Sequence, residues 1–105
     1  MSYDNTAVFK ALADPSRRSI VERLAARPLS VREITDGMTI SQPAVSQHLD
    51  LLRKAGLVKV EGRGASNIYS IDPGGLGVIR AWLDRHWSQA LENYQSLFEQ
   101  DGKEP

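Results

Sequence analysis

Apolar residues recur at spacings of three and four along most of this chain, and they alternate with polar residues over one short part. The first spacing places side chains on one face of a helix, and alternation places them on one face of a strand. The pattern predicts helices at 5–13, 15–26, 30–36, 41–55 and 74–100, and strands at 57–60 and 67–71. A glycine-rich loop over 61–66 joins the strands into a predicted hairpin.

Four of the predicted helices carry start signals, and in the last of them Asp72 is the predicted N-cap before Pro73. Asp14 precedes a proline that opens the second helix, and Ser41 stands two residues before Pro43 in the fourth. Ser30 and Glu33 match the capping box, in which each side chain bonds the backbone N–H of the other residue. These signals locate the helix starts more closely than hydrophobic spacing does.

The fourth predicted helix has two unlike faces. Its apolar positions share one side: Val45, Leu49 and Leu52. Gln47 lies opposite them, and Gln42 and Ser46 lie on one flank. Short amide and hydroxyl side chains early on a helix are what the reading of base edges in a major groove requires. We therefore predict that Gln42, Ser46 and Gln47 read DNA bases.

The order of the elements is that of a winged helix-turn-helix, in a mainly α (α+β) fold. We expect one domain over 1–105, in which 5–26 forms two helices, 30–56 the helix-turn-helix, 57–72 the wing and 74–100 a dimerisation helix. A second set of side chains is predicted to contact the DNA backbone or to support the reading helix: Ser41, Pro43, His48, Arg53, Lys54, Lys59 and Arg63. The alternative is a winged-helix module that binds another protein through the same helix face.

The last predicted helix carries a long apolar stripe that includes both tryptophans. Such a stripe either wraps the core of its own chain or forms the seam of a homodimer together with the first helix. We expect the homodimer, with these contact residues: Val8, Phe9, Leu12, Ile79, Trp82, Leu83, Trp87, Ala90, Tyr94 and Leu97. A small-molecule effector between the first and last helices, near Phe9, Trp82 and Trp87, is a further possibility.

Composition is that of an ordinary globular protein, with 41% hydrophobic and 25% charged residues. The formal net charge is zero, but residues 1–71 hold ten Lys and Arg against seven Asp and Glu, so the basic excess lies in the part that contains the reading helix. There is no cysteine, no apolar run that approaches a membrane span and no signal-peptide pattern. We expect a cytoplasmic protein that does not associate with membranes. No pattern suggests an activated nucleophile or a phosphate-binding loop, so we expect no enzyme activity.

Several segments, in order and spacing, carry a family resemblance: FKALADPSRR (9–18), SQPAVSQHL (41–49) and AGLV (55–58). They resemble the signature segments of the ArsR/SmtB family of bacterial repressors. The resemblance covers about residues 5–100 and implies a homodimeric winged-helix repressor of an inverted-repeat promoter site, often in its own promoter. Wings of this type commonly carry several arginines, whereas here Arg63 is followed by GASN, which predicts fewer phosphate contacts.

Metal sensing, known in this family, is not expected here. One family site uses a Leu-Cys-Val-Cys motif, and this chain has LSVR at 29–32. Another uses an Asp-x-His pair with a later His and Glu; Asp84 and His86 keep the pair, but the later positions are Leu97 and Gln100. We expect no metal and no cofactor, and we expect Asp84 and His86 to form a hydrogen-bonding pair.

Overall fold

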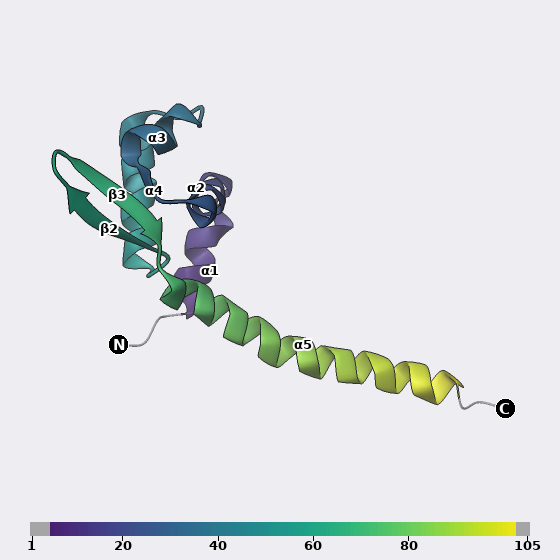
Figure 1. Cartoon of the computed structure of the whole chain (residues 1–105). Helices are drawn as coiled ribbons and strands as arrows, with labels where there is room; N and C mark the ends of the chain where they lie inside the picture. Colours follow the sequence, from purple (N-terminus) through teal and green to yellow (C-terminus); the bar gives the residue numbers. More distant parts are fainter. Residues whose placement is uncertain (1–4, 103–105) are drawn as a thin grey trace.

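The computed structural model describes residues 5–102. Its helices are α1 (Asn5–Ala13), α2 (Pro15–Ala26), α3 (Val31–Asp36), α4 (Gln42–Lys54) and α5 (Pro73–Gly102), and its strands are β1 (Leu29–Ser30), β2 (Val58–Arg63) and β3 (Ser66–Ile71). This order confirms the winged helix-turn-helix fold. Figure 1 shows α1 to α4 and the sheet gathered into one body, from which α5 extends as a single long helix.

The predicted capping signals form as expected. The Asp14 side chain accepts a hydrogen bond from the backbone N–H of Arg17 at 3.1 Å, and the Ser41 side chain accepts one from Ala44 at 3.3 Å. Ser30 and Glu33 make both bonds of the capping box, at 2.9 and 3.2 Å. Each cap supplies a partner for an amide that has none inside the helix.

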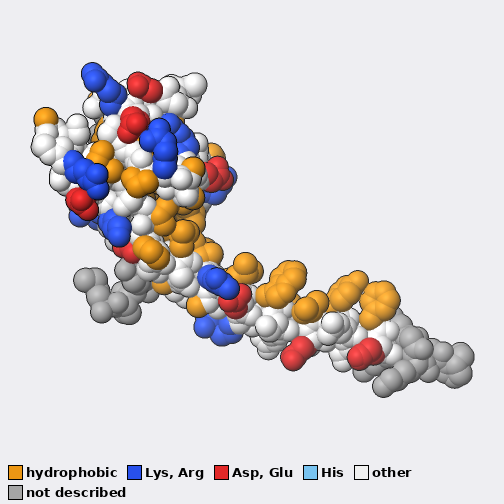
Figure 2. Space-filling view, viewed as in Figure 1, with side chains coloured by type: hydrophobic (Ala, Val, Ile, Leu, Met, Phe, Trp, Pro, Cys, Tyr) orange, Lys and Arg blue, Asp and Glu red, His pale blue; other side chains and the backbone are white. Residues whose placement is uncertain are grey.

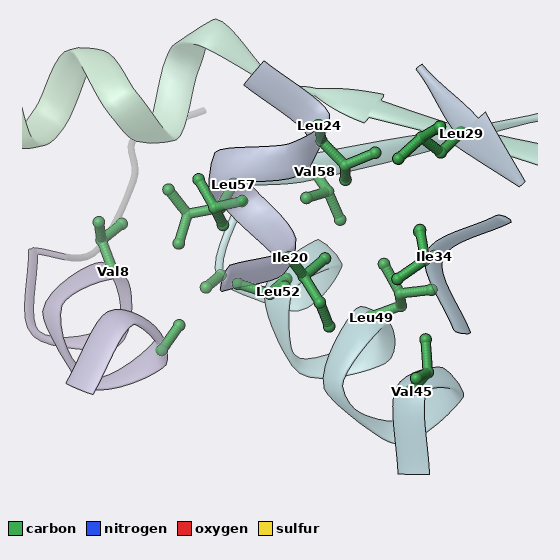
Figure 3. Packing of buried hydrophobic residues seen from close by; sticks show 13 residues of the cluster. Val8, Ile20, Leu24, Leu29, Ile34, Val45, Leu49, Leu52, Leu57 and Val58 are labelled. Atoms are coloured by element: carbon green, nitrogen blue, oxygen red, sulfur yellow. The ribbon is translucent and has the colours of Figure 1, made fainter. Parts of the chain in front are cut away.

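The core lies where α1, α2, α3, α4 and the base of the wing meet. The fully buried side chains include Val8 from α1, Ile20 from α2, Ile34 from α3 and Leu49 from α4. Figure 3 shows these side chains in one cluster, with Leu57 between Val8 and Ile20 in this view and Val58 beside Leu24. The apolar side of α4 is thus packed against its own protomer, which leaves the opposite side free.

The sheet differs from the predicted two-stranded hairpin. It has three strands in the order β1-β3-β2, because Leu29 and Ser30 pair with Tyr69 and Ile68. The predicted loop over 61–66 is also wrong. Glu61, Gly62 and Arg63 continue β2, Ser66 already belongs to β3, and only Gly64 and Ala65 form the turn. Backbone hydrogen bonds extend the ladder to a tip where both faces are exposed, so no hydrophobic alternation marks these positions.

The start of α5 is attached closely to the body. The backbone N–H of Asp72 donates to the carbonyl of Leu57 at 2.9 Å, and the Asp72 carboxylate accepts from the Gly74 N–H at 2.9 Å. A side chain at Gly75 would collide with the backbone carbonyl of Gly56, so this crossing requires a glycine. The glycines at 74, 75 and 77 lie in the first turns of α5, and Gly75 makes the close contact with the turn that follows α4.

Beyond its first turns, α5 leaves the body. The radius of gyration is 18.8 Å and the longest extent is 71 Å, whereas a compact chain of this length has a radius of gyration of about 13 Å. Within residues 5–102, no helix combines the length and hydrophobicity needed to cross a membrane.

Candidate nucleic-acid interface

The helix α4 presents a polar side to solvent. Gln42, Ser46 and Gln47 are all exposed, while the side of the same helix that holds Val45 and Leu49 is fully buried. Gln42 stands at the first position of the helix, next to the wing, and Gln47 points away from the core. The structure therefore brings the three predicted base-reading side chains onto one accessible surface.

A network from α2 holds the helix-turn-helix in place. The Arg23 guanidinium donates to the carbonyl oxygens of Ile34 and, at 2.9 Å, Glu33, both in α3. It also lies against Gly37, where an added side chain would collide with it. These carbonyls lie at the C-terminal end of α3, where the Ile34 carbonyl also accepts from the backbone N–H of the cap residue Gly37 at 3.2 Å. Arg23 therefore helps to fix the turn that leads to α4. The amino-acid sequence gives no signal for this role of Arg23, because Arg23 and the α3 carbonyls are about ten residues apart and meet only in the folded chain.

His48 is half-buried on the side of α4 that faces α2. Its Nδ1 lies 3.4 Å from a guanidinium nitrogen of Arg17, whose Nε donates to the carbonyl of Ala11 at 2.7 Å. The contact links α4 through Arg17 to the end of α1. This placement fits a supporting side chain better than one that reads bases.

The basic end of α4 is neutralised in part by its own carboxylate. Asp50 pairs with Arg53 at 3.0 Å and with Lys54 at 2.9 Å. These bonds, Lys54 first and Arg53 second, lower the pKa of Asp50. Arg53 and Lys54 are therefore not free cations in the isolated protomer. Exposed ion pairs are weak, so both side chains can exchange Asp50 for a DNA phosphate at small cost.

The wing carries few cations. Arg63 pairs with Glu61 at 3.5 Å, and Lys59 on the same strand is exposed. Between the wing tip and the start of α4 lies a polar hollow of about 370 Å³, which is lined by Ser30, Val31, Arg32, Gln42, Ala65, Ser66 and Asn67. Arg32 and Asn67 thus stand beside Gln42. They are candidate DNA contacts that could not be found from the sequence, because the fold brings them together from different elements.

Leu12 and Ile79, two of the predicted dimer residues, are half-buried against the core of their own protomer, and the small side chain of Ala90 is exposed. The other predicted dimer residues divide into two groups. Val8 was wrongly placed among them, because it is completely buried in the core of its own protomer. Phe9 and the α5 side chains Trp82, Leu83, Trp87, Tyr94 and Leu97 are exposed by 38 to 66%, as are Leu91 and Phe98. Figure 2 shows the apolar side chains of α5 in a row along one side of the helix, outside the body. Phe9 contacts Trp82 edge to face at 5.4 Å, which ties α1 to the base of this row.

Asp84 and His86 do not form the predicted pair. Asp84 pairs with Arg80 at 3.6 Å, whereas His86 Nδ1 lies 2.8 Å from the Trp82 carbonyl and its ring stacks on that of Trp82. The helical period explains this, since residues two apart point to different sides of a helix and residues four apart meet. Within residues 5–102, no three potential metal-ligating side chains of His, Cys, Asp or Glu cluster together.

Comparison with known proteins identifies the family. The profile of the bacterial regulatory proteins of the arsR family matches residues 14–60. The HTH-type transcriptional regulator Rv2034 of Mycobacterium tuberculosis is 47% identical over 94 residues, which cover 90% of this chain and 88% of that protein. The transcriptional repressor SdpR of Bacillus subtilis is 34% identical over 65 residues, which cover 62% of this chain and 72% of that protein.

Solved structures share the fold. The crystal structure of the ArsR family transcriptional regulator RHA00566 superimposes with a TM-score of 0.74 at 26% identity and covers 80% of this chain and 92% of its own. The homodimeric winged helix-turn-helix DNA-binding domain of Mb0332 from Mycobacterium bovis, a possible ArsR-family regulator, gives a TM-score of 0.64 at 25% identity, with 80% and 82% covered. The chain therefore belongs to the ArsR family of winged helix-turn-helix proteins and is a DNA-binding transcriptional regulator, not an enzyme.

Proposed function

We propose that this protein is a repressor that reads an inverted-repeat promoter site as a homodimer. The observation that carries the proposal is the exposed polar surface of α4, on which Gln42, Ser46 and Gln47 lie together while the opposite side is buried. In this arrangement α4 enters the major groove. Gln47 is suited to a bidentate contact with adenine, and Ser46 can donate to or accept from a base edge.

Backbone contacts come from the basic residues around this surface. Lys59 and Arg63 on the wing and Arg53 and Lys54 at the end of α4 supply charge without reading sequence. Three of these four are paired to carboxylates within the protomer. These side chains must give up a carboxylate partner to bind a DNA phosphate, which offsets part of the attraction. We therefore expect the affinity for DNA to depend only weakly on salt concentration.

A homodimer gives the exposed side of α5 a partner. A row of large apolar side chains on a helix that extends from the body is typical of a surface that another protein covers, because burial of apolar area is favourable. Phe9 beside Trp82 joins α1 to this surface, so the proposed contact comprises both helices. A two-fold dimer places its recognition helices in successive major grooves, about 34–36 Å apart, and this spacing matches an inverted repeat.

Autoregulation follows if the site lies in the promoter of the regulator's own gene. A repressor acts where the chromosome is, which in a bacterium is the cytoplasm. Phe9 and Trp82 pack directly on each other, so these aromatic rings are explained by packing between α1 and α5 without an effector.

A mobility-shift assay on the upstream region of the gene, with random DNA as competitor at two salt concentrations, tests the proposal. Selective binding in the nanomolar range supports a sequence-specific regulator, since specific complexes reach about 10⁻⁸ M or tighter. Equal binding to random DNA at low salt would instead favour a module that meets another protein through α4.

A further inference from the structure

A second hollow lies on the other side of α4 from the wing, between α1 and the last turns of α4. Its volume is about 420 Å³, within the range of pockets that hold small molecules. It is lined by Ala7, Lys10, Ala11, Arg17, Leu51, Lys54 and Ala55. Phe9, which belongs to the proposed dimer surface, lies on the opposite side of α1 from Ala7 and Ala11 by the helical period, so a dimer through Phe9 leaves this hollow open.

The hollow combines an apolar floor with a basic rim. Three alanines and Leu51 form the floor, and Leu51 is 50% exposed although it is a large aliphatic side chain. Exposed leucines are common singly, but here the side chain lines a concave surface beside three cations. The short side chains of Ala7 and Ala11 on α1 and of Ala55 at the C-cap of α4 create the space.

The rim holds three positive charges and one of them is fixed in place. The Arg17 guanidinium donates to the carbonyls of Ala11 at 2.7 Å and Lys10 at 3.3 Å, so its position is set by the backbone of α1. Among the described residues, Arg17 and Lys10 form no ion pair, although the Asp14 carboxylate, bound to the Arg17 backbone N–H at 3.1 Å, interacts with the Arg17 charge. Lys54 shares Asp50 with Arg53, so three cations face two carboxylates that also have other partners. The hollow is therefore positively charged, and the neutral net charge of the chain does not show this.

We propose that this hollow binds a small organic anion, a carboxylate with a short aliphatic chain. The carboxylate would lie among Lys10, Arg17 and Lys54, where charge-assisted hydrogen bonds are available. The aliphatic chain would cover the alanine floor and Leu51. A simple inorganic anion uses only the rim, and an organic cation is repelled by it.

The position of the hollow couples it to DNA binding, a step that rests on the proposed function. Lys54 lies on the same side of α4 as Gln47, two turns further on. A bound carboxylate draws Lys54 away from DNA and adds negative charge beside the phosphate backbone. DNA affinity therefore falls when the hollow is filled, and by linkage DNA lowers the affinity for the anion by the same factor.

Titration of the isotope-labelled full-length protein with hexanoate, followed by amide chemical shifts, tests the site without DNA. We expect saturable shifts confined to residues 7–11, 17 and 51–55, around the lining of the hollow, none with hexylamine, and weaker ones with inorganic phosphate. Lys10→Gln should weaken hexanoate binding about two- to fivefold, the range for one exposed ion pair. The control Lys59→Gln removes an equal charge on the wing and should bind as the unchanged protein does.

A second variant, Ala7→Leu, fills the floor without a change of charge and should abolish hexanoate binding, while its amide spectrum shows that it is folded. Equal shifts with hexanoate and hexylamine, or equal hexanoate affinity in Lys10→Gln and Lys59→Gln, would overturn the site. If phosphate binds as tightly as hexanoate, the proposal that the ligand carries an aliphatic chain is refuted. If hexanoate saturates the hollow and the affinity for a DNA site is unchanged, the coupling is refuted. If the protein binds no DNA at all, the proposed function is refuted, but the hexanoate titration still measures binding in the hollow.

Discussion

The replacement Trp87→Ala is expected to weaken the homodimer strongly. Trp87 is 61% exposed on α5, and it is one of the large apolar side chains that we assign to the dimer contact. Little in the protomer depends on it, so the variant should fold normally. The loss should therefore appear in association and not in the folding of the single chain.

The magnitude follows from the exposed area. A tryptophan side chain presents up to about 250 Å², so 61% exposure corresponds to about 150 Å² available for burial. At about 25 cal/mol per Å², complete burial contributes about 4 kcal/mol per copy. Incomplete burial and the methyl group that alanine retains reduce the loss to about 2 kcal/mol per copy. Since a two-fold interface contains the residue twice, the dimer loses about 4 kcal/mol, or roughly a thousandfold in its dissociation constant.

Sedimentation equilibrium over a range of concentrations measures this change directly. The control Arg85→Ala alters an exposed side chain on the other side of the same helix and should leave the dissociation constant unchanged. In a mobility-shift assay, Trp87→Ala should also bind a full inverted repeat more weakly while its affinity for a half-site is kept. A dimer that is equally tight in both variants, or an unchanged protein that stays monomeric at high concentration, would refute the assignment of this surface.

Three further predictions concern the body. In competition binding, Gln47→Ala should reduce the preference for the specific site over random DNA by about 1–3 kcal/mol, and an equal loss of affinity for the two duplexes would contradict base reading. Arg63→Ala should weaken binding to the specific site and to random DNA alike, and should reduce the slope of log affinity against log salt concentration by up to about 0.9. Leu49→Ala opens a cavity in the core and should lower the free energy of unfolding by about 2–5 kcal/mol in a denaturant titration. An unchanged free energy of unfolding would mean that Leu49 is not packed in the core. The hydrogen bond from the Arg17 backbone N–H holds the pKa of Asp14 below its ordinary 3.8, so its contribution to stability is present above pH 3.8 and is lost as pH falls through the lower folded value. In Asp14→Asn, the free energy of unfolding should therefore depend less on pH in the acid range. The same acid dependence in Asp14→Asn and the unchanged protein would count against this contribution of Asp14.

The local signals of the chain were sufficient for most of the fold. Apolar spacing located the helices, and the caps at Asp14, Ser30 and Ser41 formed as their side chains predict, because a cap depends only on residues up to three positions apart. The two faces of α4 were also readable, since the helical period alone sorts Val45 and Leu49 from Gln47.

Contacts between distant segments were not readable. The short strand β1 exists only because β3 lies beside it, and two residues carry no periodicity of their own. Arg23 reaches carbonyls of α3 that lie about ten residues away, and Arg17 meets His48 from a different helix. Arg53 and Lys54 were predicted to contact the DNA backbone, and only the structure shows that both pair with Asp50 in the isolated protomer.

The division therefore follows the range of the interactions. By itself the sequence determined the element order, the helix caps, the surface of α4 and the family, because each depends on near neighbours or on a pattern of residue types along the chain. Only the tertiary structure decided that Val8 belongs to the core and that the apolar row of α5 extends beyond the body. It also brought two lysines and an arginine together around a hollow between α1 and α4. Burial and charge clustering depend on which elements meet in space, and the spacing of residues along the chain does not contain that information.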